Sequence, residues 1–281
     1  MVSRRQTRCA AHACICRECP VPRNSGDDGR FWGAQLIIAL LSDIHANVGA
    51  LEACLAHARA HGAERFVFLG DFVGYGADPK SVVEIVEHYC AQGAVAVKGN
   101  HDEAVEKDAS YMNESAKAAI AWAREMLNDP QQRFLAALPL CVRDNDMCFV
   151  HASADSPQRW NYVDSAGAAR KSIEAARTTY SFCGHMHEQQ LYFQTADGKM
   201  IPFRPIPGTW IPVRRHRRWL AIVGSVGQPS SGSSAAAYTI FDRSREQITF
   251  FRVPYDHLKA AARIRQAGLP ESLAYRLEAG A

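Results

Sequence analysis

The sequence lacks any apolar run long enough to cross a membrane. Its longest such run, Leu36 to Leu41, has six residues, whereas a membrane-spanning helix needs about 20. Ser3-Arg4-Arg5 contains the arginine pair of an export signal, but the apolar stretch that such a signal requires is missing. We therefore expect a cytoplasmic protein with no membrane partner.

The chain also lacks a strong charge of either sign, since its formal net charge is +3 over 281 residues. Residues 1–35 carry six arginines and three acidic residues, which leaves the rest close to neutral. This charge distribution does not indicate nucleic acid as a partner. Arg214 to Arg218 includes four arginines, which we interpret as a solvated loop before an edge strand rather than a nucleic-acid or polyphosphate site. The flanking Trp210 and Trp219 are expected to be packing anchors.

The nine cysteines lack the paired spacing of a structural zinc site. Four of them cluster in C-x4-C-x-C-x2-C order at Cys9, Cys14, Cys16 and Cys19. Zinc binding there is the alternative to our interpretation of residues 1–34 as a disordered extension. The other five lie singly in apolar segments, as expected for buried thiols in a reducing compartment: Cys54, Cys90, Cys141, Cys148 and Cys183.

Short apolar runs alternate with amphipathic segments in the first half of the folded region, which we place at residues 35–281. Strands are predicted at Leu36–Leu41, Arg65–Leu69 and Ala94–Val97, and helices at Asn47–Ala60 and Pro79–Tyr89. Two successive βα units favour a parallel sheet with helical crossovers, and hence an α/β fold.

The second half is richer in strands. Helices are predicted at Tyr111–Leu127, Pro130–Leu138, Ser165–Ala176 and Tyr255–Gln266. Strands are predicted at Leu140–Arg143, Met147–Val150, Tyr180–Cys183, Gln190–Thr195, Trp219–Val223, Ala236–Phe241 and Gln247–Val253.

Polar side chains follow five of these strands, where functional sites of α/β sheets lie. They are Asp43, His45, Asp71, Asn100, His101, His151, His185 and His187. Asn100 and His101 are expected on a tight turn after their strand. Imidazole and carboxylate ligands together suit zinc, manganese or iron. One ion takes about four protein ligands at most, so this set fits two ions that share a carboxylate.

The same residues resemble the signature of the calcineurin-like metallophosphoesterase superfamily over residues 36 to about 253. The matching motifs are Asp43-x-His45, Gly70-Asp71-x-x-Gly74, Gly99-Asn100-His101-Asp102, His151 and Gly184-His185-x-His187. The resemblance implies a four-layer α/β/β/α sandwich of two mixed sheets, the metallophosphoesterase fold, followed by C-terminal helices.

The resemblance also implies a role for each residue. Asp43, His45 and His187 would hold one metal ion, Asn100, His151 and His185 the other, and Asp71 would bridge them. His101 would contact the phosphate and act as general acid. The implied cofactor is two divalent ions (Mn, Fe, Zn or Ni, with Mn favoured in vitro), whose bridging hydroxide attacks phosphorus.

Within the superfamily, Gly224 to Pro229 resembles a small bacterial and archaeal phosphodiesterase branch, often labelled diadenosine tetraphosphatase-like. Phosphoprotein phosphatases and symmetrical diadenosine tetraphosphate hydrolases carry an arginine shortly after Gly-Asp, but here Phe72-Val73-Gly74 follows. We therefore predict a phosphodiesterase acting on a small phosphate ester, with a phosphomonoesterase or dinucleoside polyphosphate hydrolase as alternatives. The near-neutral charge of the chain outside residues 1–35 argues against a nuclease. The presence of all eight site residues argues against an inactive protein-binding scaffold.

Overall fold

The computed structural model describes residues 36–107, 109–228 and 232–280. The predicted extension over residues 1–34 lies outside these ranges, so its boundary with the folded region stays a prediction. The proposed zinc alternative at its cysteines lies outside them too. Within the described ranges, no helix combines the length and the apolar character that crossing a membrane requires.

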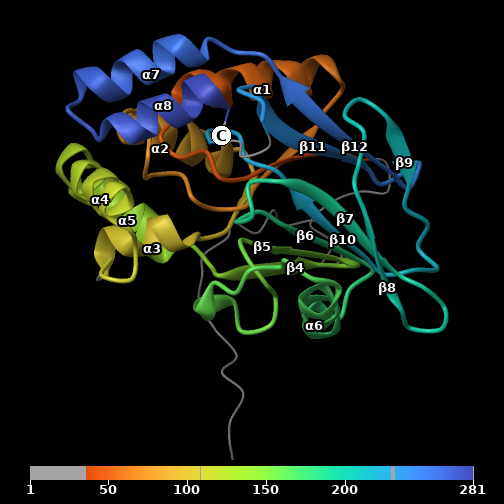
Figure 1. Ribbon diagram of the computed structural model, residues 1–281. Coiled ribbons are helices and arrows are strands. Elements are labelled where there is room, and N and C mark those ends of the chain that lie inside the picture. Colours follow the sequence, from red (N-terminus) through yellow and green to blue (C-terminus); the bar gives the residue numbers. More distant parts are fainter. Residues whose placement is uncertain (1–35, 108, 229–231, 281) are drawn as a thin grey trace, which may run out of the picture.

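Two six-stranded sheets pack face to face at the centre of the molecule (Figure 1). Across the first sheet the strands are β3 (Val95–Ala96), β2 (Arg65–Phe68), β1 (Ile37–Leu41), β11 (Ala236–Asp242), β12 (Gln247–Val253) and β9 (Trp210–Pro212). Across the second they are β4 (Cys141–Asp144), β5 (Met147–Val150), β6 (Tyr180–Cys183), β10 (Trp219–Val223), β7 (Gln189–Gln194) and β8 (Met200–Phe203).

Strand β1 shows why the apolar runs are continuous. Ala39 and Leu41 face the helices outside the first sheet, whereas Ile38 and Leu40 face the second sheet. Successive side chains of a strand point to opposite faces, so a strand covered on both sides needs apolar residues at every position. One hydrophobic core therefore packs on each face of β1, and together they fix the position of the end of this strand.

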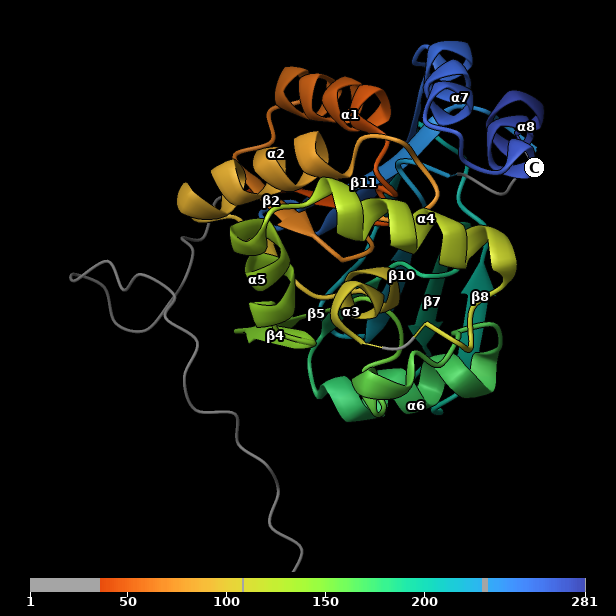
Figure 2. The same ribbon diagram turned by 90° about the vertical axis from the view of Figure 1, so that its left-hand side faces the viewer.

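The helices complete a four-layer arrangement. They are α1 (Val48–Ala60), α2 (Pro79–Ala91), α3 (Asn100–Glu106), α4 (Glu114–Met126), α5 (Asp129–Ala137), α6 (Ala166–Ala176), α7 (His257–Gln266) and α8 (Glu271–Ala279), with a 3-10 turn η1 at Pro157–Arg159. Helices α1 and α2 contribute to the core outside the first sheet, and α6 covers the second. Figure 2 shows α4 crossing in front of the sheets, with α3 and α5 beside it. The predicted α/β/β/α sandwich is confirmed.

Several predictions about single elements need correction. The two βα units predicted a parallel sheet, but both sheets are mixed, as the family resemblance implied. In the first sheet β1 pairs in parallel with β2 and antiparallel with β11, and in the second β10 pairs in parallel with β6 and antiparallel with β7. Asn100 and His101 lie in the first turn of helix α3, not on a tight turn. The helix predicted from Tyr111 begins only at Glu114, because the Asn113 side chain caps it by accepting from the Ala116 amide. Strands β8 and β9 and helix α8 were not predicted as separate elements.

The segment around Arg214 to Arg218 was predicted only in part. It is an exposed loop, as expected, and Arg214 and Arg215 pair with Glu246. The strand that follows, β10, is interior rather than an edge strand, since β6 and β7 flank it. Trp219 is buried as predicted, but Trp210 is 60% exposed because it lies on edge strand β9.

All five cysteines in the described ranges are free thiols, as predicted. Cys54, Cys148 and Cys183 are buried, and the other two are half-buried. Burial raises the pKa of Cys54 and Cys183 well above the usual range of a thiol, so these two stay protonated. They act as small apolar side chains of the core.

Candidate active site

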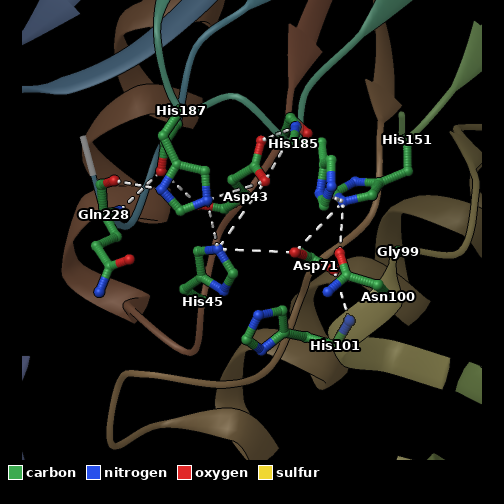
Figure 3. A network of polar contacts seen from close by, with 12 residues as sticks. Asp43, His45, Asp71, Gly99, Asn100, His101, His151, His185, His187 and Gln228 are labelled. Atoms are coloured by element: carbon green, nitrogen blue, oxygen red, sulfur yellow. Dashed lines mark hydrogen bonds and ion pairs between the residues drawn. The ribbon is translucent and has the colours of Figure 1, made fainter. Parts of the chain in front are cut away.

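All eight site residues expected from the sequence lie together at the carboxyl ends of strands from both sheets (Figure 3). Asp43 and His45 follow β1, Asp71 follows β2, Asn100 and His101 follow β3, His151 follows β5, and His185 and His187 follow β6. The two sheets face each other here, so the chain brings together residues more than 140 positions apart, such as His45 and His187.

The backbone at these residues is strained. Asp43, His45, Asp71, His185 and His187 all have positive φ, between 49° and 65°. Side chains other than glycine rarely adopt this left-handed region, and such residues gather at functional sites where the surrounding structure holds them in place. The strain turns each side chain from the line of its strand toward the same point.

The first cluster consists of Asp43, His45 and His187. His187 Nε2 lies 3.3 Å from Asp43 Oδ1 and 3.0 Å from His45 Nε2. His45 Nε2 is also 3.9 Å from Asp43 Oδ1. Their ligand atoms are close enough to bind one cation together.

The second cluster is centred on His151. Its Nε2 lies 3.1 Å from His185 Nδ1 and 3.2 Å from Asn100 Oδ1. Asp71 Oδ2 is 3.3 Å from the same Nε2 and 3.8 Å from His45 Nε2 in the first cluster. The Asp71 carboxylate therefore lies between the two clusters, as Figure 3 shows.

Backbone carbonyls orient three of the imidazoles. Nδ1 of His45 lies 3.1 Å from the Val73 oxygen, Nδ1 of His151 2.7 Å from the Leu69 oxygen, and Nδ1 of His187 2.8 Å from the Gln228 oxygen. A carbonyl can only accept, so each Nδ1 carries a hydrogen, and in the neutral form of each ring Nε2 presents a lone pair to the centre. Metal-binding histidines are held in this way, and the donor set fits divalent cations.

Burial and mutual charge set the ionisation of the site. Burial tends to raise the pKa of Asp43, but His187 and His151 offset it and the pKa falls to about 2. Burial has the same effect at Asp71, but the neighbouring imidazoles of His151, His101 and His45 together outweigh it and lower the pKa well below its usual value. Burial lowers the pKa of His185 to about 4. At neutral pH both carboxylates are ionised and His185 is neutral, the forms that bind a metal ion.

Asp102, which the motif contains but to which no role was assigned, holds two of the site loops together. Its carboxylate accepts hydrogen bonds from the backbone amides of Asp71, Phe72 and Gly99, at 2.8, 2.8 and 2.9 Å. A Cβ atom at Gly99 would lie only 2.1 Å from Asp71 Oδ1, so a larger residue does not fit there. The two loops are therefore fixed against each other by one buried side chain.

His101 lies beside the two clusters. Its backbone amide donates to Asp71 Oδ1 at 2.9 Å, and its ring packs between His45 and Tyr75. A Cβ atom at Gly74 would lie 2.3 Å from His101 Nδ1, so the glycine makes room for the ring. Burial lowers the pKa of His101, although the charge of Asp71 acts against this.

A cleft of about 190 Å³ opens beside the clusters. Its lining residues are Asp71, Tyr75, Asn100, His101, Tyr111, Met112, Asn113, Ala116, Tyr162, His185 and His187. Five of the eight predicted site residues are among them, namely Asp71, Asn100, His101, His185 and His187. Among the described residues, this lining contains three tyrosines and no arginine or lysine. The tyrosines were not predicted as site residues, because single aromatic residues in loops carry no pattern.

Comparison with known proteins places these features in context. The family model of the calcineurin-like phosphoesterase superfamily domain matches residues 36–246. An uncharacterised protein of Methanocaldococcus jannaschii is 32% identical over 255 residues, which cover 87% of this chain and 98% of that protein.

Solved structures with the same architecture are also known. A crystal structure described as a metallophosphoesterase from Sphaerobacter thermophilus has a TM-score of 0.78 and 35% identity, covering 88% of this chain and all (100%) of that one. A hypothetical protein from Pyrococcus horikoshii has a TM-score of 0.70 at 19% identity, covering 87% of this chain and 98% of that one. At that identity, the second match concerns the fold alone.

Proposed function

Because this chain belongs to the calcineurin-like phosphoesterase superfamily and is a metal-dependent phosphoester hydrolase, we propose that its substrates are small-molecule phosphodiesters. The observation that carries this proposal is the absence of arginine and lysine from the described lining of the cleft. A phosphomonoester has a second ionisation with a pKa of about 6 and so carries nearly two charges at neutral pH. A diester carries one.

A described lining without arginine or lysine suits the smaller charge. Arginine is the usual partner for phosphate oxygens, because its planar fork donates two parallel hydrogen bonds. The loop after Gly70-Asp71 supplies no such group, because its next two residues, Phe72 and Val73, are apolar and fully buried in the core. Ligands in the cleft meet tyrosine, asparagine and histidine instead.

We assign the two metal positions by cluster. Asp43, His45 and His187 would hold one ion, and Asn100, His151 and His185 the other, with Asp71 between them. The oxygen and nitrogen donors, without thiolate, suit manganese, iron, zinc or nickel, and we propose manganese for activity in vitro. When bound, two such ions supply a nucleophile from water at neutral pH and neutralise charge at the phosphoryl oxygens.

His101 is the proposed general acid. It lines the cleft next to the metal-binding clusters, and its Nδ1 has no hydrogen-bond partner among the described residues. Burial keeps the ring neutral in the free site, and the negative charge of a bound phosphate would favour its protonation. A proton held on this ring can pass to the leaving oxygen as its charge develops.

The test compares two substrates with the same leaving group on protein stripped of metal and reloaded with manganese. We expect kcat/KM for bis(4-nitrophenyl) phosphate to exceed that for 4-nitrophenyl phosphate by at least about tenfold, or about 1.4 kcal/mol. His151→Gln, purified in parallel, should lose activity on both and so exclude a contaminating phosphatase. A preference for the monoester would contradict the proposal, as would a preference for dinucleoside polyphosphates or for nucleic acid over the diester.

A further inference from the structure

Two exposed tyrosines flank the cleft. Tyr111 is 60% exposed and Tyr162 is 57% exposed, although both line the same cavity as the metal-binding residues. Tyr111 lies in the loop before α4, and Tyr162 lies in the loop between η1 and α6. Large aromatic side chains left open to solvent at the mouth of a site provide surface for a ligand.

Both rings are fixed in position by residues of the second cluster. The ring of Tyr162 stacks on that of His185, with centroids 4.2 Å apart and planes 18° from parallel. The hydroxyl of Tyr111 donates to the backbone oxygen of Asn100 at 3.3 Å. The two tyrosines therefore stand on the side of the cleft formed by Asn100 and His185.

The loop that carries Tyr162 is itself held in place. Ser156 and Trp160, on either side of η1, have positive φ values of 57° and 54°. The Trp160 indole donates to Glu103 Oε2 of helix α3 at 3.0 Å, and its ring meets that of His151 at 5.9 Å. This strained and anchored loop gives Tyr162 a defined place, as a specific binding surface requires.

The tyrosine hydroxyls are compatible with a phosphate nearby. A phenol ordinarily loses its proton only at about pH 10, so both side chains are neutral at pH 7 and do not repel an anion. The cavity of about 190 Å³ is smaller than the roughly 300–1,000 Å³ of typical ligand sites, so part of a substrate would extend past the two rings.

We propose that Tyr111 and Tyr162 form a stacking surface for a nucleobase, so that the preferred phosphodiesters contain a nucleoside. This inference rests on the proposed function and names the class of its substrate. With no arginine or lysine in the described lining to orient the phosphate, stacking of a planar ring supplies the missing orientation. Tyrosine suits a nucleobase, because its ring covers the face while its hydroxyl meets the polar edge.

The activity test uses two diesters with the same nitrophenolate leaving group, thymidine 5′-(4-nitrophenyl phosphate) and methyl 4-nitrophenyl phosphate. Base stacking on an aromatic side chain is worth about 1–3 kcal/mol, or roughly 5- to 150-fold. We expect the wild type to prefer the thymidine ester by such a factor, and Tyr111→Leu and Tyr162→Leu to lose most of it. Their loss of activity on the methyl ester should be smaller, so the readout is the ratio of kcat/KM for the two esters, which should fall toward one. Tyr275→Leu is the matched control, because Tyr275 is 63% exposed on α8 and does not line the cleft.

Equal losses on both esters, accompanied by loss of metal from Tyr162→Leu, would show that Tyr162 only supports His185 and would overturn the inference.

A binding measurement separates this inference from the proposed function. In the presence of a chelator, where no turnover occurs, calorimetry should give tighter binding for adenosine monophosphate than for ribose 5-phosphate. Tyr162→Leu should remove that difference. If the enzyme prefers monoesters but the binding difference persists, only the proposed function fails. If adenosine monophosphate and ribose 5-phosphate bind equally while diesters are hydrolysed, only the proposed stacking surface is contradicted.

Discussion

His45 and His187 face each other with their Nε2 atoms 3.0 Å apart, while the Nδ1 atom of each ring is bound to a backbone carbonyl. In the neutral rings both hydrogens are therefore on Nδ1, and two lone pairs point at one another. No hydrogen bond can form between such atoms unless one ring is protonated. Burial, with the charge of His101, lowers the pKa of His45 and so disfavours that state. A shared metal cation satisfies both lone pairs at once.

The metal-free site should show a pH dependence that comes from His151. Burial acts to lower the pKa of His151, but the charges of Asp71 and Asp43, together with hydrogen bonds to Asp71 and the Leu69 carbonyl, outweigh it and raise that pKa from 6.5 to about 9. A raised pKa means that the charged form stabilises the fold, so this contribution is fully present below pH 6.5 and is lost as the pH rises to 9. The contribution is on the order of 1–3 kcal/mol, since one pKa unit corresponds to about 1.4 kcal/mol.

This effect is measured as the difference in unfolding free energy between the wild type and His151→Gln, by urea denaturation with a chelator at pH 6.5 and pH 9. The difference is needed because Cys141, whose pKa is lowered to about 7 by a hydrogen bond with the Cys148 thiol, titrates in the same range. We expect the wild-type advantage to shrink at pH 9. An advantage that grows with pH would mean that His151 is not charged beside Asp71.

Asp102 should matter for stability as much as for metal binding. Asp102→Asn keeps the shape but turns an amide NH2 toward backbone donors, so at least one of the amides of Asp71, Phe72 and Gly99 loses its acceptor. A buried group without a partner costs about 1–3 kcal/mol, and we expect a loss of that size in urea denaturation. Asp129→Asn, on the exposed start of α5, is the control and should change stability by less than about 0.5 kcal/mol. Equal stability of the two variants would show that Asp102 does not hold the loops.

The residue pattern alone predicted most of the strands and helices and the polar centre of the site, whereas the four-layer sandwich was implied by the family resemblance. Strands such as Tyr180–Cys183 and Trp219–Val223 have the predicted bounds, because buried strands flanked by turn residues carry a strong signal. The ligand motifs stand directly after these strands, so locating the strands also located the site. Helix α3 was missed because its seven residues begin within the Gly99-Asn100 turn signal.

Other features depend on contacts that no local pattern encodes. Strands β8 and β9 were not predicted, since each contains a proline, Pro202 or Pro212, which is tolerated at the sheet edges where they lie. Tyr111 was assigned to a helix and Tyr162 to no element, yet both reach the cleft through loops whose course is set by Asn113 and Trp160. Trp210 was expected to be a packing anchor, but an aromatic residue on a short edge strand can remain exposed.

The proposed role of His101 can be separated from metal binding by changing the leaving group. General acid catalysis contributes about 10²–10⁴-fold, and most when the leaving oxygen is basic. His101→Gln should keep both metal ions and lose little rate on a nitrophenyl diester, but lose far more on a dialkyl or dinucleoside diester. The comparison is the ratio of the two losses in kcat/KM, with metal content measured in parallel. Equal losses would restrict His101 to positioning the phosphate, and lost metal would make it a ligand.

The position of Asp71 between the two clusters, 3.3 Å from His151 and 3.8 Å from His45, is the geometric basis of the proposed two-metal site. The most direct test is the manganese content per chain after dialysis, measured by elemental analysis for the wild type, Asp71→Asn and His187→Gln. We predict two ions in the wild type, weakened binding of both in Asp71→Asn, and loss of mainly one in His187→Gln. Two tightly bound ions in Asp71→Asn would contradict the bridging role, and a single ion in the wild type would contradict the two-metal site itself.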